Sequence, residues 1–259
     1  MDALWLSPIY PSQDADFGYD VADYTAIDPK YGTLEDFDAL LHAAHQRGLR
    51  IVLDLVLNHT SDQHPWFQES RSSLDNPKRD WYVWKRGREG NPPTNWFSAF
   101  GGSAWQHDLL TGEYYYHYFF KEQPDLNWKN PQVQEAMFNA ARFWLDMGVD
   151  GFRLDAIGTI FEDESYPPMT LDFGQERLFK YLREAKTPKD QQLVMKYWTE
   201  MFKHQVDQPA VHQVTRKLRQ VVDEYHDRVL IGETDDVSFY GNNDELHLNF
   251  NFPLMRTDS

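Results

Sequence analysis

The chain of 259 residues carries 25 Lys and Arg against 41 Asp and Glu, which gives a formal net charge of −16 and argues against nucleic-acid binding, since such binding depends on cationic contacts to phosphate. It has no cysteine, which excludes disulfides and thiolate metal sites, and no apolar run approaches the ~18 residues of a membrane span. A hydrophobic content of 41% with 15% aromatic residues supports a large folded core, while the acidic charge balance suits a neutral ligand.

The first part of the chain predicts two strands separated by a helix. A short apolar run at 3–7 is closed by Pro8 and predicts a buried strand. Residues 33–48 predict a helix that begins after the N-cap residue Thr33 and ends at Gly48. The near-continuous apolar run at 50–58 is typical of a parallel strand that is covered on both faces.

The remaining chain predicts an insertion followed by further strand and helix units. Residues 59–129 are rich in Trp, Tyr, Pro and Gly with poor periodicity, which indicates an inserted subdomain, whereas 158–208 give only weak loop and helix signals. The other expected elements are helices at 131–148 and 210–226, strands at 149–157 and 228–233, and a plausible fifth strand at 246–252. Alternating strands and helices predict an α/β fold with a parallel sheet. We therefore expect three segments: 1–58 and 130–259 in the main fold, and 59–129 in the insertion.

Polar residues follow three consecutive predicted strands. His59 follows the second, Arg153 and Asp155 lie near the end of the third, and Glu233 ends the fourth. Ligands of parallel α/β sheets bind at the carboxyl ends of the strands. A single Arg-x-Asp is more often a structural ion pair than a functional one. The convergence of an imidazole, a guanidinium and two carboxylates at one edge favours a functional site.

Two carboxylates beside an arginine fit glycosidic bond cleavage, in which one carboxylate is the nucleophile and the other holds a proton as general acid. Arg153 shares a strand face with Asp155 and is expected to keep it ionised as the nucleophile. Glu233, in "LIGETDD", has only acidic sequence neighbours, which are expected to raise its pKa as suits the acid/base. Metal-assisted hydrolysis through His59 is the alternative chemistry, but the chain has no HExxH and no zinc-type spacing.

Several motifs in the same order carry a family resemblance. The stretches "WLSPIYPS", "GYD", "DLVLNHTSDQHPWF", "FGGSAW", "QPDLNW", "DGFRLDAI" and "LIGE" resemble glycoside hydrolase family 13, the α-amylase family, and within it the α-glucosidase and oligo-1,6-glucosidase group. The match is close over 1–157 and at 228–233, and thin between them. The resemblance implies a partial (β/α)8 TIM barrel with a small domain B inserted after the third barrel strand, and a fragment that spans barrel strands 2 to 6. The family's Asn-His-Asp motif does not occur in this sequence.

The resemblance also implies a role for each candidate residue. The implied catalytic residues are the nucleophile Asp155, the acid/base Glu233 and the nucleophile's partner Arg153. The implied sugar-binding residues are Asp16, which would grip the terminal glucose, the stacking platform Tyr19, the sugar-bonding His59, and the aromatic walls Phe100 and Phe119. Asp54 and Asn58 resemble motif residues whose role is mainly structural. Taken alone, Asp16 would be a turn residue and Tyr19 more often a core aromatic, whereas Phe100 and Phe119 fit a core and a pocket equally well.

The expected activity is that of a retaining α-glucosidase acting on short α-linked oligosaccharides. A transglycosylase, a sugar isomerase or a catalytically silent homologue are the alternatives. Ala156 stands where α-1,6-preferring members carry Val, so we expect a preference for α-1,4 linkages. We expect no cofactor and no metal, because the family's calcium site after the first barrel strand is not in this chain, and no nucleic-acid or membrane partner. The first residues lack the basic stretch of a secretory signal, so a cytoplasmic location is expected.

Overall fold

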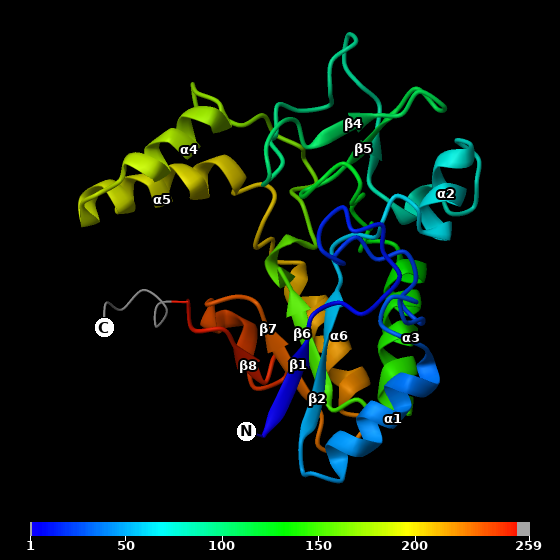
Figure 1. Cartoon of the computed structure of the whole chain (residues 1–259). Coiled ribbons are helices and arrows are strands. Elements are labelled where there is room, and N and C mark those ends of the chain that lie inside the picture. Colours follow the sequence, from blue (N-terminus) through cyan, green and yellow to red (C-terminus); the bar gives the residue numbers. More distant parts are fainter. Residues whose placement is uncertain (1, 253–259) are drawn as a thin grey trace.

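A parallel sheet forms the centre of the computed structural model, which describes residues 2–252 (Figure 1). The sheet has five strands in the order β1-β2-β6-β7-β8, and each neighbouring pair is parallel. The strands are β1 (Ala3–Leu6), β2 (Arg50–Val56), β6 (Gly151–Asp155), β7 (Val229–Gly232) and β8 (Leu248–Asn249). Strand order therefore follows chain order around the sheet, as in a (β/α)8 barrel, and the predicted partial barrel is confirmed.

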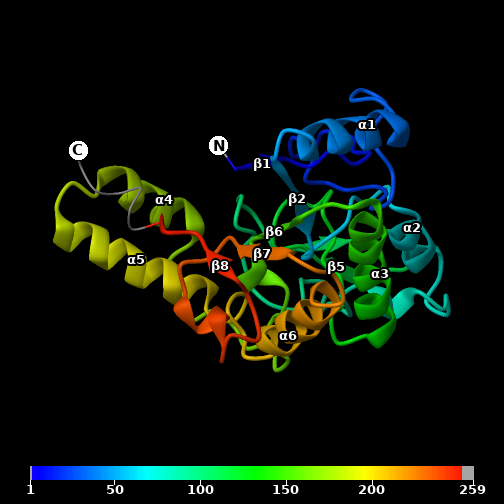
Figure 2. The same cartoon turned by 90° about the horizontal axis from the view of Figure 1, so that it is seen from below.

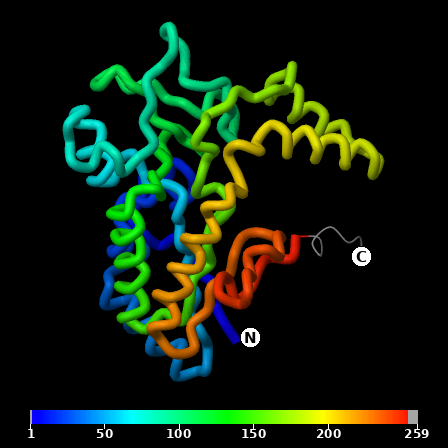
Figure 3. The backbone as a smooth tube through the Cα atoms, turned by 180° about the vertical axis from the view of Figure 1, so that it is seen from behind, coloured from blue at the N-terminus to red at the C-terminus, as the bar shows by residue number. Residues whose placement is uncertain are grey.

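Three helices cover one face of this sheet, as Figures 2 and 3 show. They are α1 (Leu34–His45), α3 (Pro131–Met147) and α6 (Val211–Val222). Helix α1 begins at the predicted N-cap Thr33, whose hydroxyl accepts from the Asp36 N–H. Helix α3 begins with a proline and ends at Gly148, whose φ of 104° is left-handed and suits glycine.

The main core lies between these helices and the sheet. Trp144 of α3 is fully buried, packs edge-on against Phe37 of α1 at 5.3 Å, and donates from Nε1 to the Tyr24 carbonyl at 2.7 Å. Trp128 is also buried and donates to the Leu57 carbonyl at the end of β2 at 2.7 Å. Both indoles combine a large apolar contact with a satisfied N–H group, which fixes the helices against the strands that carry the site.

The inserted region lies beyond the carboxyl ends of the parallel strands, at the top of Figure 1. It contains a three-stranded antiparallel sheet in the order β3-β5-β4. Its elements are α2 (Pro65–Ser72), the 3₁₀ turn η1 (Arg79–Trp81), β3 (Trp84–Lys85), β4 (Trp105–His107) and β5 (Tyr114–Tyr116). The predicted small insertion after the second strand of this sheet is confirmed as a feature of the fold, while its exact bounds, 59–129, stay a prediction.

A two-helix hairpin occupies the region where the sequence signals were weak. Helices α4 (Gln175–Glu184) and α5 (Pro188–Phe202) project from the body of the molecule (Figure 1). They share a second core with the inserted region, and its buried side chains are Val83, Trp96, Ala104, Trp105, Tyr116 and Tyr118 from the insertion, and Met169, Leu178, Val194, Met201 and Phe202 from the hairpin segment. The insertion and the hairpin are thus packed as one apolar unit above the sheet.

All five predicted strands are shorter than expected, and the third and the fifth differ most. The strand expected at 149–157 ends at Asp155, because Ala156 adopts a left-handed conformation with φ 39° and starts the 3₁₀ turn η2 (Ile157–Thr159). The strand expected at 246–252 is reduced to Leu248–Asn249, which follows a second such turn, η3 (Val237–Tyr240). No helix within residues 2–252 is both long and apolar enough to cross a membrane.

Candidate active site

One pocket of about 260 Å³ at the carboxyl ends of the parallel strands brings the sequence candidates together. Its lining consists of Asp16, Tyr19, His59, Phe100, Phe119, Arg153, Asp155, Ala156 and Glu233. All eight predicted site residues are in that set, although they come from separate parts of the chain. The remaining lining residue is Ala156, which follows Asp155 directly.

The buried guanidinium of Arg153 is the centre of the pocket's charge. Its Nη1 lies 2.7 Å from Asp155 Oδ1 and 2.7 Å from Asp54 Oδ1, and its Nη2 lies 2.7 Å from Glu233 Oε2. Strand register explains this convergence, since Asp54 of β2 is the direct neighbour of Arg153 on β6. Both candidate catalytic carboxylates are therefore held against one cation.

The electrostatic argument made from the sequence is wrong on two points. Glu233 does have a basic neighbour, because β7 pairs with β6 and brings its carboxylate to Arg153. Asp155 is not held at a low pKa: burial raises its pKa to about 7, and the repulsion from Asp54 and Glu233 adds to this, although Arg153 acts in the opposite direction. Neighbours in the sequence were a poor guide to the charges that the fold brings together.

Glu233 has a second anchor in the backbone of the turn that follows the neighbouring strand β6. Its Oε2 accepts from the Ala156 N–H at 2.9 Å. Ala156 can point its N–H toward Glu233 because it leaves the strand with φ 39° and ψ 46°, a conformation that non-glycine residues rarely adopt. The turn after Asp155 thereby links the two carboxylates by a backbone contact as well as through Arg153.

Behind the lining residues Asp16 and His59 lies a residue that the sequence analysis did not single out. Gln123 is fully buried, donates from Nε2 to Asp16 Oδ2 at 3.0 Å, and accepts from the Phe120 N–H at 3.0 Å. The same Nε2 lies 2.9 Å from His59 Nε2. Burial lowers the pKa of His59 to about 4, so its imidazole is neutral near pH 7. Gln123 opens the "QPDLNW" motif, which was the available signal for it.

The loop that presents Asp16 is anchored by Asp20. The buried carboxylate of Asp20 accepts from the Ser12 hydroxyl at 2.7 Å, the Gln13 N–H at 3.1 Å and the Asp16 N–H at 3.1 Å. Asp16 itself is half-buried, and this burial raises its pKa. Its place in the pocket favours the ligand-binding interpretation over that of a simple turn residue.

Three aromatic side chains form the rest of the lining. The Tyr19 hydroxyl donates to Asp54 Oδ2 at 3.0 Å, and its ring lies 5.9 Å from the Arg153 guanidinium. Phe119 packs edge-on against His59 at 5.3 Å, and Phe100 lies 5.4 Å from Phe119. Phe100 is 49% exposed, so it is a rim residue and not a core aromatic.

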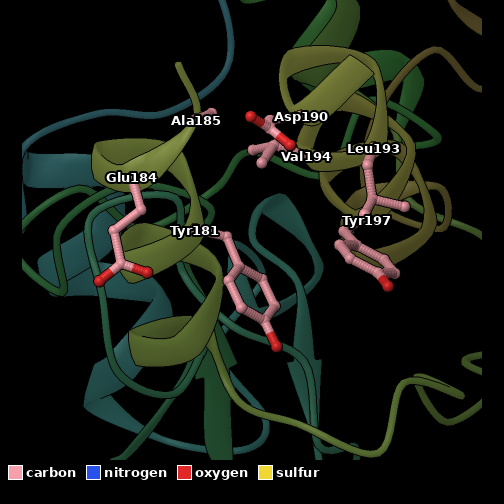
Figure 4. Close-up of a pocket in the computed structure, with 7 residues that line it drawn as sticks. All are labelled: Tyr181, Glu184, Ala185, Asp190, Leu193, Val194 and Tyr197. Carbon is pink, nitrogen blue, oxygen red and sulfur yellow. The ribbon is translucent and has the colours of Figure 1, made fainter. Parts of the chain in front are cut away.

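A larger hollow, of about 360 Å³, lies between α4 and α5 (Figure 4). Its lining includes the tyrosines Tyr181 and Tyr197 and the carboxylates Glu184 and Asp190. The Asp190 carboxylate accepts from the Thr187 N–H at 3.0 Å in the cap of α5, so it is already used by the helix. The residues that line this hollow include no cation, and we assign the chemistry to the smaller pocket. Nowhere in residues 2–252 do three or more His, Asp or Glu side chains form a group suited to a metal ion.

Comparison with known proteins finds matches over the whole chain. The model of the α-amylase catalytic domain matches residues 1–259. The oligo-1,6-glucosidase of Bacillus cereus is 40% identical over 266 residues, which cover 100% of this chain and 44% of that protein. The α-glucosidase of Schizosaccharomyces pombe (strain 972) is 57% identical over 179 residues, covering 66% of this chain and 31% of that protein. A crystal structure of an α-glucosyl transfer enzyme superposes with a TM-score of 0.86 at 40% identity, covering 100% of this chain and 48% of the other. The chain thus spans less than half the length of these relatives.

Proposed function

The chain belongs to the α-amylase family, glycoside hydrolase family 13, and on that premise we propose that the whole protein containing it is a retaining α-glucosidase. Its substrates would be short oligosaccharides with a terminal α-linked glucose. The observation that carries the proposal is the convergence of Asp155 and Glu233 on the two Nη atoms of Arg153 inside one pocket. Such a pair of carboxylates on either side of a glycosidic bond is what a double displacement requires.

In the proposed reaction, Asp155 attacks the anomeric carbon of the terminal glucose while Glu233 gives its proton to the departing glycosidic oxygen. A covalent glucosyl-Asp155 ester forms, and the aglycone leaves as an alcohol. Glu233 then takes a proton from water, whose oxygen attacks the same carbon and releases glucose and the Asp155 carboxylate. Retaining enzymes hold the two carboxyl groups about 5–5.5 Å apart. Bridging by one guanidinium supports that short spacing.

Protons must be redistributed before the first step. Asp155 has to be ionised to attack, although its pKa is about 7, and Glu233 has to be protonated to act as the acid. In the structure Glu233 instead pairs with Arg153. We infer that the bound glycosidic oxygen draws Glu233 away from Arg153, which leaves the guanidinium to Asp155 and Asp54 and favours the ionised nucleophile.

The other lining residues support binding of a terminal sugar. A pocket of about 260 Å³ lined by Asp16 and His59 suits one hexose ring, and these polar groups, which Gln123 contacts from behind, match sugar hydroxyls. Tyr19 and Phe119 add aromatic walls. Ala156 beside the nucleophile supports a preference for α-1,4 over α-1,6 linkages. The proposed reaction uses only side chains of this chain.

Trapping of the covalent glucosyl-Asp155 intermediate tests the proposal. The whole protein is incubated with 5-fluoro-α-D-glucosyl fluoride, and its peptides are analysed by mass spectrometry. We expect one hexosyl adduct on the peptide that contains Asp155. Glu233→Gln should still form the adduct, because fluoride departs without a proton, and should release it more slowly. Asp155→Asn should give none. An adduct on another carboxylate, or none on the unmodified protein, would contradict the assignment.

Transglycosylation is a second candidate, supported by the likeness to the α-glucosyl transfer enzyme. The intermediate would be the same, and a sugar hydroxyl would attack it in place of water. Attack by the released sugar itself would give isomerisation. Product analysis with maltose and with sucrose separates these outcomes, since hydrolysis yields free monosaccharides and transfer yields new oligosaccharides or isomers.

A further inference from the structure

Two segments far apart in the sequence cross behind His59 and are paired by their backbones. The Leu126 N–H donates to the Asn58 carbonyl at 2.9 Å, and the Thr60 N–H donates to the Pro124 carbonyl at 3.3 Å. His59 and Asp125 face each other across this antiparallel bridge. Asn58, His59 and Asp125 are all buried, so their polar atoms must satisfy one another.

The hydrogen-bond partners of Asp125 fix the orientation of the Asn58 amide. Asp125 Oδ1 accepts from the Tyr118 N–H at 2.9 Å, and the carboxyl group also accepts from the side chain of Asn58. Only the NH₂ of an amide can donate, so this group faces Asp125. Asn58 Oδ1 is buried without a hydrogen-bond partner, which shows that the NH₂ contacts decide how the amide lies.

The same NH₂ group determines which nitrogen of His59 carries a proton. Asn58 Nδ2 lies 3.2 Å from His59 Nδ1, and its second hydrogen is available for that contact. Nδ1 must then be the unprotonated acceptor, and the ring proton must be on Nε2. His59 Nε2 lies 3.2 Å from the Tyr19 carbonyl, which is an acceptor and fits this tautomer.

The opposite tautomer fits the surroundings less well. It would gain a hydrogen bond from Gln123 to Nε2, but Nδ1–H would face the Asn58 NH₂, and the Nε2 lone pair would face the Tyr19 carbonyl. With the proton on Nε2, the N–H of His59 faces the Tyr19 carbonyl beside the pocket that His59 lines, while the Gln123 NH₂ donates to Asp16. An oxygen of a bound sugar can share this His59 N–H with the Tyr19 carbonyl.

We propose that Asn58 and Asp125 are positioning residues that hold His59 as its Nε2–H tautomer, so that a neutral imidazole offers a hydrogen-bond donor to the pocket. The sequence analysis had assigned Asn58 a structural role and had not considered Asp125 individually. The tautomer follows from the hydrogen bonds alone, while its use in binding a sugar hydroxyl rests on the function proposed above.

Asp125→Asn tests the chain of contacts with an isosteric change. The introduced amide would accept from the Tyr118 N–H through its oxygen and turn its NH₂ toward Asn58, whose own amide must then flip. The Asn58 oxygen would face His59 Nδ1, and the ring proton should move from Nε2 to Nδ1. The ¹⁵N chemical shifts of the ring nitrogens distinguish protonated from unprotonated nitrogen, and comparison with His59→Gln assigns the His59 signals. Unchanged His59 shifts in folded Asp125→Asn would overturn the proposal.

A matched control and a second variant keep the test interpretable. Asp108→Asn also removes a buried carboxylate of the inserted region, one that binds Arg71 and Thr111, and should leave the His59 shifts unaltered. If Asp125→Asn does not fold, the double variant Asn58→Asp, Asp125→Asn is used instead. It exchanges donor and acceptor in the contacts of residue 58 with residue 125 and with His59, and it keeps the number of hydrogen bonds. This pair should give the Nδ1–H tautomer, and an Nε2–H tautomer there would contradict the proposal.

Measurements of turnover distinguish the tautomer of His59 from the role of that tautomer in sugar binding. On 4-nitrophenyl α-glucoside, the tautomer-inverted variant should lose roughly 10- to 100-fold in kcat/KM, because a buried donor to the sugar becomes an acceptor. An inverted tautomer with unchanged kcat/KM would overturn the positioning role and leave the α-glucosidase proposal intact. An unmodified protein that lacks glucosidase activity, with the ring shifts as expected, would contradict the proposed function and not the tautomer.

Discussion

Glu233 Oε2 lies 2.7 Å from Arg153 Nη2, while Nη1 of the same guanidinium holds Asp155. The two carboxylates are therefore coupled through one cation, and the charge of Glu233 is among the causes that raise the pKa of Asp155. This coupling makes the pH dependence of turnover a direct probe of the site.

We predict that the acidic limb of kcat/KM reports Asp155 and lies near pH 7, the pKa that burial imposes on it. Below that pH the carboxyl group is protonated and cannot attack, so activity rises as pH increases through the pKa. Arg153→Gln removes the group that lowers this pKa, and the limb should move to higher pH while turnover falls on the order of 100-fold or more. Arg142→Gln, which breaks an exposed pair with Glu224, should leave the profile in place. A limb that stays fixed in Arg153→Gln would show that another group controls it.

Ala156→Val should change linkage preference. A β-branched side chain next to Asp155 narrows the site where the second sugar binds, and the ratio of kcat/KM on isomaltose to that on maltose should increase. The left-handed φ of 39° at this position also predicts a loss of roughly 1–2 kcal/mol in the free energy of unfolding. Ala156→Gly is the control, since glycine accepts this conformation and adds no branch, so the ratio should stay as it is. An equal ratio in all three proteins would remove Ala156 from the account of specificity.

Gly151→Ala should separate β6 from β7. A Cβ at residue 151 would lie 2.2 Å from the Val229 carbonyl oxygen and 2.9 Å from its nitrogen, so the backbone of β7 has to move. We expect a loss of about 2–4 kcal/mol in the free energy of unfolding by urea. Because β7 leads into Glu233, a displacement on the order of 1 Å would also cost ~100-fold in turnover. Gly174→Ala is the control, because a Cβ there would contact only Phe97, at 3.6 Å. It should lower neither the free energy of unfolding nor turnover.

His64 makes stability depend on pH. Burial lowers its pKa from 6.5 to about 4, and its unprotonated Nδ1 accepts from the Trp66 N–H at the start of α2. The unfolded chain binds this proton first, so the free energy of unfolding should fall as pH decreases from about 6.5 to about 4. His64→Asn keeps a good N-cap and removes the titration, and the decline should be shallower by roughly 1.4 kcal/mol per pH unit. Equal slopes in urea unfolding at several pH values would contradict this.

Local signals were sufficient for the strands of the parallel sheet and for Arg153, Asp155 and Glu233, whereas Asp16, Tyr19, Phe100 and Phe119 came from the family resemblance. The cap at Thr33, the proline at the start of α3 and the apolar runs of β2 and β6 each have a local physical cause, and each appears in the structure. The electrostatics could not be obtained this way. The charges acting on Glu233 and Asp155 come from strand pairing, and their burial depends on the whole fold.

The same limit explains the residues that were missed. Gln123 acquires its contacts to Asp16 and His59 only when segments distant in sequence meet in the pocket. The hairpin of α4 and α5 gave weak signals because much of its apolar surface is satisfied by the inserted region and not by a regular neighbour. Features whose partner lies far along the chain were the ones that periodicity and spacing did not reveal.

The second apolar core has a consequence for how this protein can diverge. Tyr118 of the insertion packs edge-on against Phe202 at the end of α5, at 5.9 Å. The insertion and the hairpin therefore bury their apolar side chains against each other. A recombination event that replaced one and kept the other would mismatch that interior and expose it to water. The insertion and the hairpin of α4 and α5 must therefore be inherited together. They are nevertheless separated in the gene by the segment that encodes β6, the strand that carries Arg153 and Asp155.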